Sequence, residues 1–497
     1  MEPLSISTQS PSSSSSLFTS QSTMEFTRKT LFLSFSFLSF FTIPIFSHLF
    51  SPLDNYLIDC GSTAPTTLID NRPFSGDLTG KHTPLSSSSH VVSIRNQSPL
   101  PGLPSIYHTA RVFTNPTRYS FPIKDRGTHM VRLHFHPFDS PKLDLGRAQF
   151  HVLVDGHVVL SNFTRLMKTG GDGNPRVVEY LIWVDSKKLV IVFVPSKDSK
   201  LAFVNAIEVI SAPKDLVPVK AQYLNLGNLE SFDGLNMQAL EVVYRVTVGG
   251  PKVTPFNDSL WRTWVTDDEF FKSSVGSERI VFGGRIKYQV GGASREVGPD
   301  NVYNSARLIR SKNDSVPNVN MTWVFSIVGG YKYLVRLHFC DVASISLGLL
   351  YFNVYVNGYL ASEDLDLSYM TNSLASPYYA DFVVDGDSST GTGALSVSIG
   401  PSKNSIPHVI DGILNGVEVM KMNNSRNSLD GDVCAGFVMQ SWSSGNSGIV
   451  LTFMAAVCIV LSLAIVIRRR MVESRESVSW SRLPVNLSDD NVKTSNI

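Results

Sequence analysis

The chain has 497 residues, of which 43% are hydrophobic and 17% are charged, and its formal net charge is +1. This composition is typical of folded, secreted domains rich in β-strands. A near-neutral chain without a basic stripe between aromatic residues has no electrostatic surface for nucleic acid, which excludes that class of partner. About 400 residues remain once the chain ends are set aside, so we expect two hydrophobic cores and two domains.

Residues 1–51 are predicted to form a Ser-rich leader followed by a secretory signal peptide. The stretch before Met24 is polar and has no apolar periodicity, so it cannot bury a core. After Met24, Arg28 and Lys29 precede an apolar run that ends in small residues, which is the pattern of a signal peptide. We expect Met24 rather than Met1 to be the working start, and an uncleaved signal anchor is the alternative.

The region after the leader contains two copies of one sequence pattern. The segment MVRLHFHPF from Met130 returns as LVRLHFCDV from Leu334, and FHVLVDGHVVL from Phe150 returns as FNVYVNGYLAS from Phe352. Four more pairs of segments keep the same order along the chain: YLIDCG and YRVTVG, YHTAR and YNSAR, VPSKDS and GPSKNS, NAIEV and NGVEV. This indicates a duplicated domain, because a solenoid would have shorter repeats and more copies.

Each copy has the sequence pattern of β-structure. In VRLHF the apolar residues alternate with Arg and His, which predicts a strand with one face in water. Asp155-Gly156 and Asn357-Gly358 lie between β-rich segments and favour two-residue hairpins, because these residues accept positive φ. Short, closely spaced strands without a long amphipathic helix predict an all-β sandwich in each copy.

An apolar segment near the end of the printed sequence predicts a membrane anchor. Residues 449–467 carry no charge and are followed at once by three arginines. As a helix, such a segment spans the ~30 Å hydrocarbon core of a bilayer. Because Lys and Arg stay on the cytoplasmic side, we expect a single-pass type I protein of the plasma membrane with its N-terminal domains outside the cell.

These features divide the chain into seven predicted segments. The two domains are residues 54–212 and 240–422, joined by a linker at 213–239. The leader is residues 1–51, and a polar juxtamembrane stalk is expected at 423–448. The transmembrane helix is placed at 449–467 and a cytoplasmic tail, too short to bury a core, at 468–497.

Long segments of both copies match the sequence pattern of one known family. They are YLIDCGS from Tyr56, VRLHFHPF from Val131, YRVTVGGPKVTPFNDSLWRTWVTDDEF from Tyr244, YLVRLHFCD from Tyr333, LYFNVYVNG from Leu350, DLDLS from Asp364, PYYADFV from Pro377 and SIGPS from Ser398. In these segments the chain resembles the extracellular half of the plant malectin-like receptor kinases, the group that includes FERONIA and THESEUS. The resemblance implies two tandem malectin-like β-sandwiches that face the cell wall. It also implies binding of secreted cysteine-rich peptides and cell-wall polysaccharide, often with a small lipid-anchored co-receptor.

The sequence departs from that family in its kinase motifs. A kinase needs a Gly-rich loop, a Lys for the phosphates and two Asp residues for catalysis and metal binding. The segment after Arg470 contains no glycine. Gly391-Thr392-Gly393 and Asp381-Phe382-Val383 match kinase motifs only in part and fall on the extracellular side. We therefore expect no enzymatic activity and no cofactor.

Three polar groups could suggest metal binding or catalysis, and a structural role is preferred for each. His134 and His136 have the spacing of metal ligands on a strand, but alternation on a strand face explains them equally well. Residues 267–269 (DDE) could bind calcium but are typical of a solvated loop. Asp364 and Asp366 could form the carboxylate pair of a glycoside hydrolase, although nothing in the sequence gives them acid and base environments. We predict no metal site.

Aromatic residues are the candidates for contact with a sugar, because ring faces stack on pyranose faces. Most aromatic residues of a β-sandwich belong to its core, so these are candidates only: Tyr107, Phe138, Trp261, Trp264, Tyr378 and Tyr379. The sequence does not place a peptide site.

In an extracellular protein, cysteines can form disulfides and Asn-x-Ser/Thr sequons can be glycosylated. Cys60, Cys340 and Cys434 allow at most one internal disulfide, and the sequence does not choose the pair. Five Asn-x-Ser/Thr triplets are predicted N-glycosylation sites: Asn162, Asn257, Asn313, Asn320 and Asn423.

Three functions are compatible with these features. The first is a non-catalytic cell-surface receptor-like protein that binds cell-wall carbohydrate or a secreted peptide and signals through a partner receptor kinase or acts as a kinase-less decoy. The second is a transmembrane receptor Ser/Thr protein kinase of which these residues are only a part. The third is a structural tether between wall and membrane. The ligand and the oligomeric state are left open.

Overall fold

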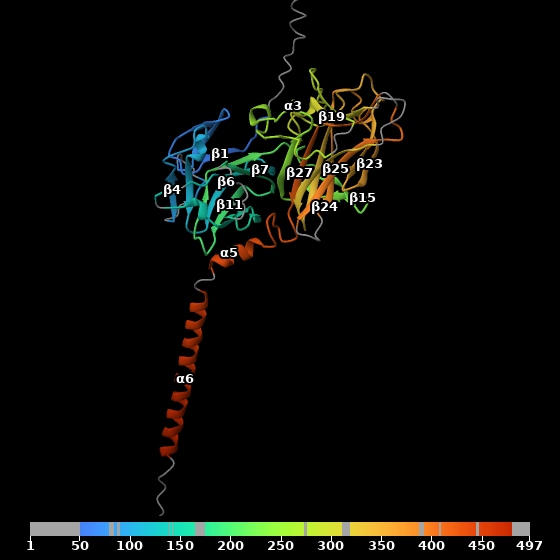
Figure 1. Ribbon diagram of the computed structural model, residues 1–497. Helices are drawn as coiled ribbons and strands as arrows, with labels where there is room; N and C mark the ends of the chain where they lie inside the picture. Colours follow the sequence, from blue (N-terminus) through green and yellow to red (C-terminus); the bar gives the residue numbers. More distant parts are fainter. Residues whose placement is uncertain are drawn as a thin grey trace, which may run out of the picture. The chain divides into compact units, whose positions relative to one another are not determined.

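The computed structural model describes residues 50–78, 84–86, 90–138, 140–141, 143–164, 174–272, 276–310, 319–386, 392–406, 409–443 and 447–479. The predicted signal peptide lies outside these residues except for its last two positions, and most of the predicted tail also lies outside them. The described part is mostly β-strand, and its strands form two sandwiches (Figure 1).

The first repeat contributes thirteen strands and two short 3-10 helices. In chain order they are β1 (Asn55–Asp59), β2 (Thr67–Ile69), β3 (Arg72–Gly76), β4 (Val91–Arg95), η1 (Ser105–Tyr107), β5 (Thr109–Phe113), β6 (Thr117–Pro122), β7 (Gly127–Phe135), η2 (Leu145–Arg147), β8 (Phe150–Val154), β9 (His157–Leu160), β10 (Arg176–Val184), β11 (Lys188–Pro195), β12 (Ala202–Val204) and β13 (Ala206–Ser211).

The second repeat and the segment after it contain the remaining elements. They are β14 (Lys220–Asn225), β15 (Asn228–Asp233), η3 (Leu235–Met237), β16 (Leu240–Thr247), η4 (Pro255–Asn257), β17 (Val265–Thr266), β18 (Ser277–Val281), α3 (Asp300–Tyr303), β19 (Ser305–Arg310), β20 (Met321–Val328), β21 (Lys332–Cys340), β22 (Tyr351–Val356), β23 (Tyr359–Asp366), α4 (Leu367–Thr371), β24 (Pro377–Asp385), β25 (Thr392–Pro401), β26 (Ile410–Leu414), β27 (Gly416–Met422), α5 (Ala435–Ser443) and α6 (Ser447–Ser479).

Each sandwich closes around its own hydrophobic core. In the first repeat the inner face of β7 supplies Val131, Leu133 and Phe135, which pack with residues of the smaller sheets β6-β11-β8-β9 and β12-β5-β4. In the second repeat β21 supplies the equivalent Val335, Leu337 and Phe339 against β20-β25-β22-β23 and β18-β19-β26. The all-β prediction of two tandem sandwiches is confirmed.

The two predicted Asp-Gly and Asn-Gly hairpins are present at equivalent positions. Asp155 and Gly156 have φ values of 47° and 88° between β8 and β9, and Asn357 and Gly358 have 52° and 79° between β22 and β23. Positive φ at both central residues is the backbone of a type I′ turn.

One sheet continues from the first sandwich into the second. β10 pairs with β16 at Tyr180↔Glu241 and Leu181↔Leu240, which joins the large sheets of both repeats into thirteen strands. The face opposite the two cores carries a third apolar cluster, which includes Met130, Leu181 and Leu240. The junction is therefore a packed layer with its own core.

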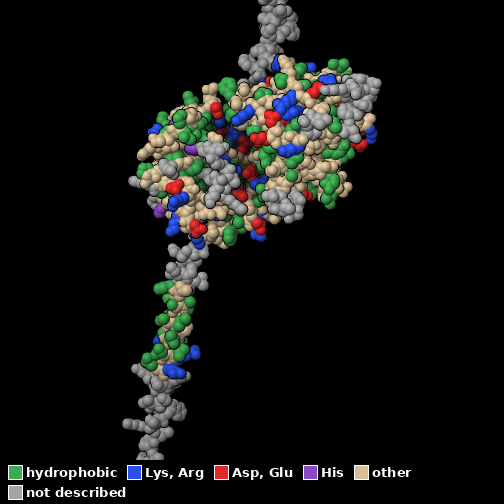
Figure 2. Space-filling model, viewed as in Figure 1, with side chains coloured by type: hydrophobic (Ala, Val, Ile, Leu, Met, Phe, Trp, Pro, Cys, Tyr) green, Lys and Arg blue, Asp and Glu red, His purple; other side chains and the backbone are tan. Residues whose placement is uncertain are grey.

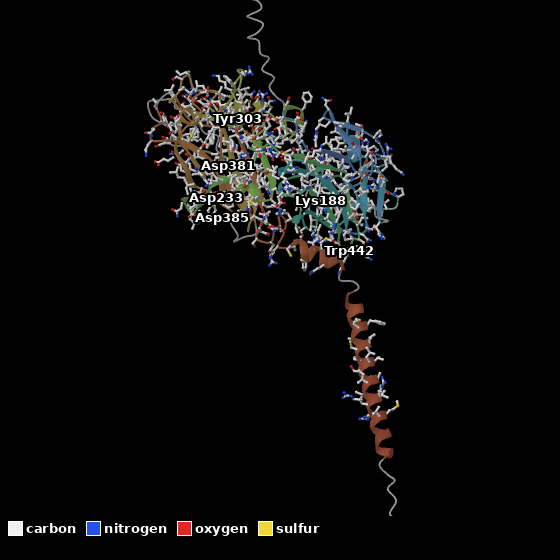
Figure 3. All side chains as sticks on the ribbon, turned by 180° about the vertical axis from the view of Figure 1, so that it is seen from behind. Lys188, Asp233, Tyr303, Asp381, Asp385 and Trp442 are labelled. Carbon is white, nitrogen blue, oxygen red and sulfur yellow. The ribbon has the colours of Figure 1, made fainter. Side chains whose placement is uncertain are left out.

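The predicted linker, residues 213–239, differs from a simple connection. Its hairpin β14-β15 extends the sheet of the second repeat, since β14 pairs with β24. Tyr223 of β14 donates to Asp385 at the end of β24, and Asp233 of β15 lies at the same side of the molecule (Figure 3). Leu216, Val217 and Leu235 are buried in the third cluster, so this segment covers the junction.

The predicted stalk, residues 423–448, also differs from an extended spacer in its described part. Leu429 is fully buried in the core of the first repeat, and its N–H donates to the Val158 carbonyl at 2.8 Å. Helix α5 packs Val438, Met439 and Trp442 against a small cluster on the first sandwich (Figure 3). The chain thus returns from the second repeat to the first before α6 begins.

Helix α6 contains the predicted membrane anchor. Residues Thr452–Val472 form an apolar segment of 21 residues with mean hydropathy 2.0, and none of its hydrophobic window is buried. It is the one helix among the described residues that is long and apolar enough to cross a membrane. The predicted span at 449–467 lies within α6.

Candidate ligand-binding cleft

A row of alternating charges crosses the continuous sheet at the junction of the repeats. Each member is the cross-strand neighbour or ion-pair partner of the next, and each is 9% exposed or less. In order across the sheet they are Asp381 (β24), Arg336 (β21), Glu418 (β27), Arg245 (β16), Glu179 (β10), Arg132 (β7), Glu208 (β13) and Arg72 (β3). Buried charges need such partners, because an unpaired one carries a large desolvation penalty.

Arg132 and Arg336 show why the strand face predicted to be in water is buried. Arg132 donates through Nε to Glu179 at 2.6 Å and through Nη2 to the Leu260 carbonyl at 2.8 Å. Arg336 is bound to Asp381 and donates to the Leu216 carbonyl at 2.8 Å. The polar face of VRLHF is therefore covered by other segments, and the prediction of a solvated face is wrong.

The arginines of this row keep its glutamates charged. Burial alone would raise the pKa of Glu179, but Arg132 and Arg245 outweigh it and lower that pKa to about 2. Burial also opposes ionisation of Glu208, and Arg132 with the hydrogen bond from His134 holds its pKa well below the usual range. Glu179 and Glu208 are therefore ionised and paired with arginines at neutral pH.

Both repeats place a tyrosine and a histidine beside this row. The Tyr107 hydroxyl lies 2.9 Å from Nδ1 of His134, and the Tyr303 hydroxyl lies 2.9 Å from Nδ1 of His338. Burial raises the pKa of Tyr107 and lowers the pKa of His338. These side chains are held in place by hydrogen bonds rather than left free for proton transfer.

A cleft of about 620 Å³ opens over the charged row between the two repeats. Its walls combine β10, β16 and the loop around β17 with the turn before β3 and η1. Figure 2 shows acidic and basic side chains gathered in this hollow of the surface. A concave site with aromatic walls and a few fixed polar groups is the usual form of a ligand pocket.

Two of the six aromatic candidates line this cleft, and the sequence did not distinguish them. Tyr107 and Trp261 are on its wall, and the Trp261 ring lies under the guanidinium of Arg72 at 5.2 Å.

The other four candidates lie elsewhere. Phe138 and Trp264 are buried in core clusters. Tyr378 packs on the second core, and Tyr379 stacks on Arg336 at 4.4 Å. None of these four borders the cleft.

The charged members of the site were not predicted from sequence. Glu179, Arg72 and Arg245 lie in strands whose local pattern resembles that of any half-exposed strand. A signal did exist for Glu208 and Glu418, which recur at the same position of NAIEV and NGVEV. A charge that returns inside a duplicated apolar segment indicates a buried partner.

Several of the polar groups considered for metal or catalysis have structural partners. His134 is bound to Tyr107 and Glu208. Asp267 accepts from the Trp323 indole at 2.9 Å and from Arg307. Asp366 caps α4. Within the described residues no group of three or more His, Cys, Asp or Glu side chains could hold a metal.

The cysteines do not form the disulfide that the sequence allowed. Cys60 is buried in the core of the first repeat and Cys340 in a cluster of the second, so the two sandwiches separate them. Cys434 lies just before α5, and all three are free thiols in the described structure. Burial raises the pKa of Cys60 and of Cys340, which makes both thiols poor nucleophiles.

The sequons differ in accessibility. Asn162, Asn257 and Asn320 are exposed. Asn423 is only half exposed, and its side-chain oxygen accepts from the N–H of Ala239 at 2.9 Å. Asn313 lies outside the described residues. Glycosylation at these five positions stays a prediction.

This architecture defines a class: a tandem β-sandwich ectodomain with a composite cleft, followed by a candidate membrane span. The malectin-like domain family matches residues 58–422, and the chain belongs to that family, in which its relatives include the plant receptor-like kinases THESEUS 1 and FERONIA. It comprises the ectodomain and the apolar helix of such proteins, and the described residues form no kinase domain.

Comparison with individual relatives agrees with this assignment. Receptor-like protein kinase THESEUS 1 of Arabidopsis thaliana is 39% identical over 82% of this chain and 46% of its own length. Receptor-like protein kinase HERK 1 of the same plant is 37% identical over 90% of this chain and 52% of its own length. The chain thus spans about half the length of the curated relatives it matches.

This chain aligns with solved ectodomain structures over almost their whole length. The FER chain crystallised with the plant peptide RALF23 and LLG2 is 32% identical, with a TM-score of 0.65 over 77% of this chain and 98% of that chain. The ANX2 ectodomain of Arabidopsis thaliana is 26% identical, with a TM-score of 0.67 over 76% of this chain and 99% of that chain.

Proposed function

We propose that this protein is a receptor-like protein of the plasma membrane whose tandem malectin-like ectodomain binds a secreted peptide, a cell-wall carbohydrate or both. The observation that carries the proposal is the likeness to FER, whose ectodomain has been crystallised with the peptide RALF23 and with LLG2. By analogy, the partners are a cysteine-rich peptide and a small lipid-anchored co-receptor. The exposed apolar helix supports the membrane location.

The binding site we propose is the junction cleft. It brings the partly exposed ring of Trp261 together with the buried Tyr107 and with fixed charges from both repeats, and the Trp261 ring can contact a ligand on this concave surface. A ligand held there would contact both sandwiches at once. Neither sandwich alone would supply the whole site.

The inward signal would pass through a partner receptor kinase, or the protein would act as a decoy that removes ligand from its kinase-bearing relatives. A transmembrane receptor Ser/Thr protein kinase, of which these residues are the extracellular part, is the alternative. Sequencing the transcript past the codon for Ile497 distinguishes the two, because a continuing reading frame with kinase motifs supports the alternative. A wall-to-membrane tether is the third candidate, and it predicts wall binding without any peptide binding.

The binding proposal is tested with the full chain in lipid nanodiscs, immobilised on a biosensor. Secreted cysteine-rich peptides, with and without a lipid-anchored co-receptor, and soluble wall polysaccharides are passed over it. We expect saturable binding of at least one class that a Trp261→Ala substitution weakens by about tenfold, as for an aromatic residue at the centre of an interface. Absence of saturable binding to every ligand of both classes would contradict the proposal.

A further inference from the structure

The continuous sheet forks at the floor of the cleft. β10 and β16 are paired only at Tyr180↔Glu241 and Leu181↔Leu240, although both strands continue beyond these residues toward the cleft. On its other edge β10 is paired with β7 over its whole length, and β16 is paired with β27 except at Val243. The segments 176–179 and 242–245 therefore face each other without a strand between them.

The short strand β17 fills only the far end of this fork. Val265 and Thr266 pair with Val246 and Thr247 of β16, in parallel. Next to them the edge of β16 at residues 242–245 has no paired strand and lines the cleft. An unpaired strand edge offers its backbone N–H and C=O groups to an added strand.

The side chains around the fork suit an extended peptide. Val177, Val243 and Val265 are 46%, 37% and 40% exposed at the cleft wall. Three partly exposed valines on neighbouring strands provide apolar contacts for alternate side chains of an added strand.

The uncompensated charge of the cleft is negative. Its buried charges are all paired, those of the alternating row with one another and Arg262 with Asp258 at 3.0 Å. Asp70 and Glu269, in contrast, line the cleft, are exposed, and form no ion pair with any residue that the structure describes. A cationic side chain would find partners at both positions, whereas an anionic chain would be repelled.

We propose that the fork between β10 and β16 receives an extended peptide segment of another protein, which adds as a short strand to the free edge of β16 in line with β17. A Lys or Arg side chain of that segment is bound by the carboxylates of Glu269 and Asp70. The inference rests on the proposed peptide-binding function and specifies its site and the chemistry of its ligand.

The peptide used to test this proposal is obtained by selection from a library. A random dodecapeptide library on phage is panned against the full chain in lipid nanodiscs, and enriched sequences are synthesised for affinity measurements. We expect enriched peptides to carry a Lys or Arg among β-branched residues. We expect the best of them to bind Val243→Lys about tenfold more weakly, and Glu269→Gln about threefold more weakly, than the unaltered chain.

Matched controls and a charge exchange separate docking from misfolding. Val281→Lys alters an exposed valine of β18, an edge strand of a different sheet from that of β10 and β16, and Glu230→Gln alters an exposed carboxylate of β15. Both should bind the peptide as the unaltered chain does. Glu269→Lys should bind a peptide whose Lys is replaced by Glu more tightly than the unaltered chain binds that peptide.

The outcomes distinguish the two proposals. Peptides that bind saturably but are insensitive to Val243→Lys and Glu269→Gln overturn the fork as the site and leave peptide binding intact. If no peptide binds and a galacturonate oligomer does, the peptide half of the proposed function fails together with this inference. Binding of that anionic oligomer in the fork, measured as its loss in the Val243→Lys variant, overturns the charge argument.

Discussion

At the scale of single residues, Arg245 is the electrostatic connection between the sandwiches. Its Nη2 donates to Glu179 of the first repeat at 2.7 Å, and its Nε lies 3.5 Å from Glu418 of the second. In the duplicated pattern YLIDCG and YRVTVG the position equivalent to Arg245 is Leu57. The connection therefore depends on a residue at which the two copies differ.

Replacing Arg245 by Met should destabilise the protein strongly. The substitution leaves two buried carboxylates without their shared cation, and removing one partner of a buried ion pair costs about 3 kcal/mol or more. We expect the free energy of unfolding, measured by urea denaturation of residues 52–443, to fall by about that amount. Arg279→Met removes an exposed ion pair with Asp268 and should cost less than about 1 kcal/mol. Equal effects of the two substitutions would contradict the structural role of Arg245.

Glu179 predicts the pH dependence of stability. Its pKa is lowered from 4.5 to about 2 in the folded protein. The stabilisation of the fold by ionised Glu179 is therefore complete when the pH is above the pKa of this group in the unfolded chain. It is lost as the pH falls toward the pKa in the folded protein. We expect this group to contribute roughly 3 kcal/mol at neutral pH, most of which disappears between about pH 5 and pH 2. The urea concentration at the midpoint of unfolding should therefore fall less steeply with decreasing pH in the Glu179→Gln variant than in the control variant Glu230→Gln. If the midpoints of the two variants fall in parallel, the ion pairs of Glu179 do not stabilise the fold.

At the scale of elements, the segment after the second repeat fastens the two ends of the ectodomain together. Leu429 is buried in the first core and α5 packs on the first sandwich. The N–H of Ser161 donates to the carboxylate of Asp430 at 2.7 Å. The position at which the chain leaves the ectodomain toward α6 is thereby fixed on the first repeat.

A buried charge on α5 should release it. Val438 is 1% exposed and Phe437, its neighbour, is 62% exposed. Val438→Asp places an unpaired carboxylate in an apolar contact, so the amides of α5 should lose their protection from hydrogen exchange. Phe437→Asp should leave that protection unchanged. The packing is contradicted if both variants exchange like the unaltered protein.

Structural elements that are determined by neighbouring residues in the chain could be predicted from the sequence. Elements that depend on partners far away in the sequence could not. The hairpin at Asp155-Gly156 follows from backbone preference alone. The pairing Tyr180↔Glu241 joins strands of different repeats, and no local pattern indicates it. The same applies to Arg132, which reads as a solvent-exposed strand residue until the segment at Leu260 covers it.

At the scale of the molecule, the two repeats form one structural unit within the ectodomain. They share a thirteen-stranded sheet, a third apolar cluster and a charged row that runs through both. The sequence predicted the duplication and the sandwiches correctly. It did not predict the cleft, because the walls come from segments of both copies that meet only after the sheet is joined.

This shared junction predicts cooperative unfolding. Opening either sandwich exposes the third cluster and leaves ion pairs of the row unpartnered, so neither repeat should persist alone. We expect differential scanning calorimetry of residues 52–443 to give one transition whose calorimetric and van't Hoff enthalpies agree. Two separate transitions would show that the junction contributes little to stability.

The central claim is that ligand is held at the junction of the repeats, and hydrogen exchange tests it most directly. Amide exchange of the full chain in nanodiscs is measured with and without a saturating selected peptide. The account predicts new protection in residues 176–179, 242–245 and 263–270, the segments of the fork and its rim. Protection confined to other surfaces, with these three segments unchanged, would contradict it.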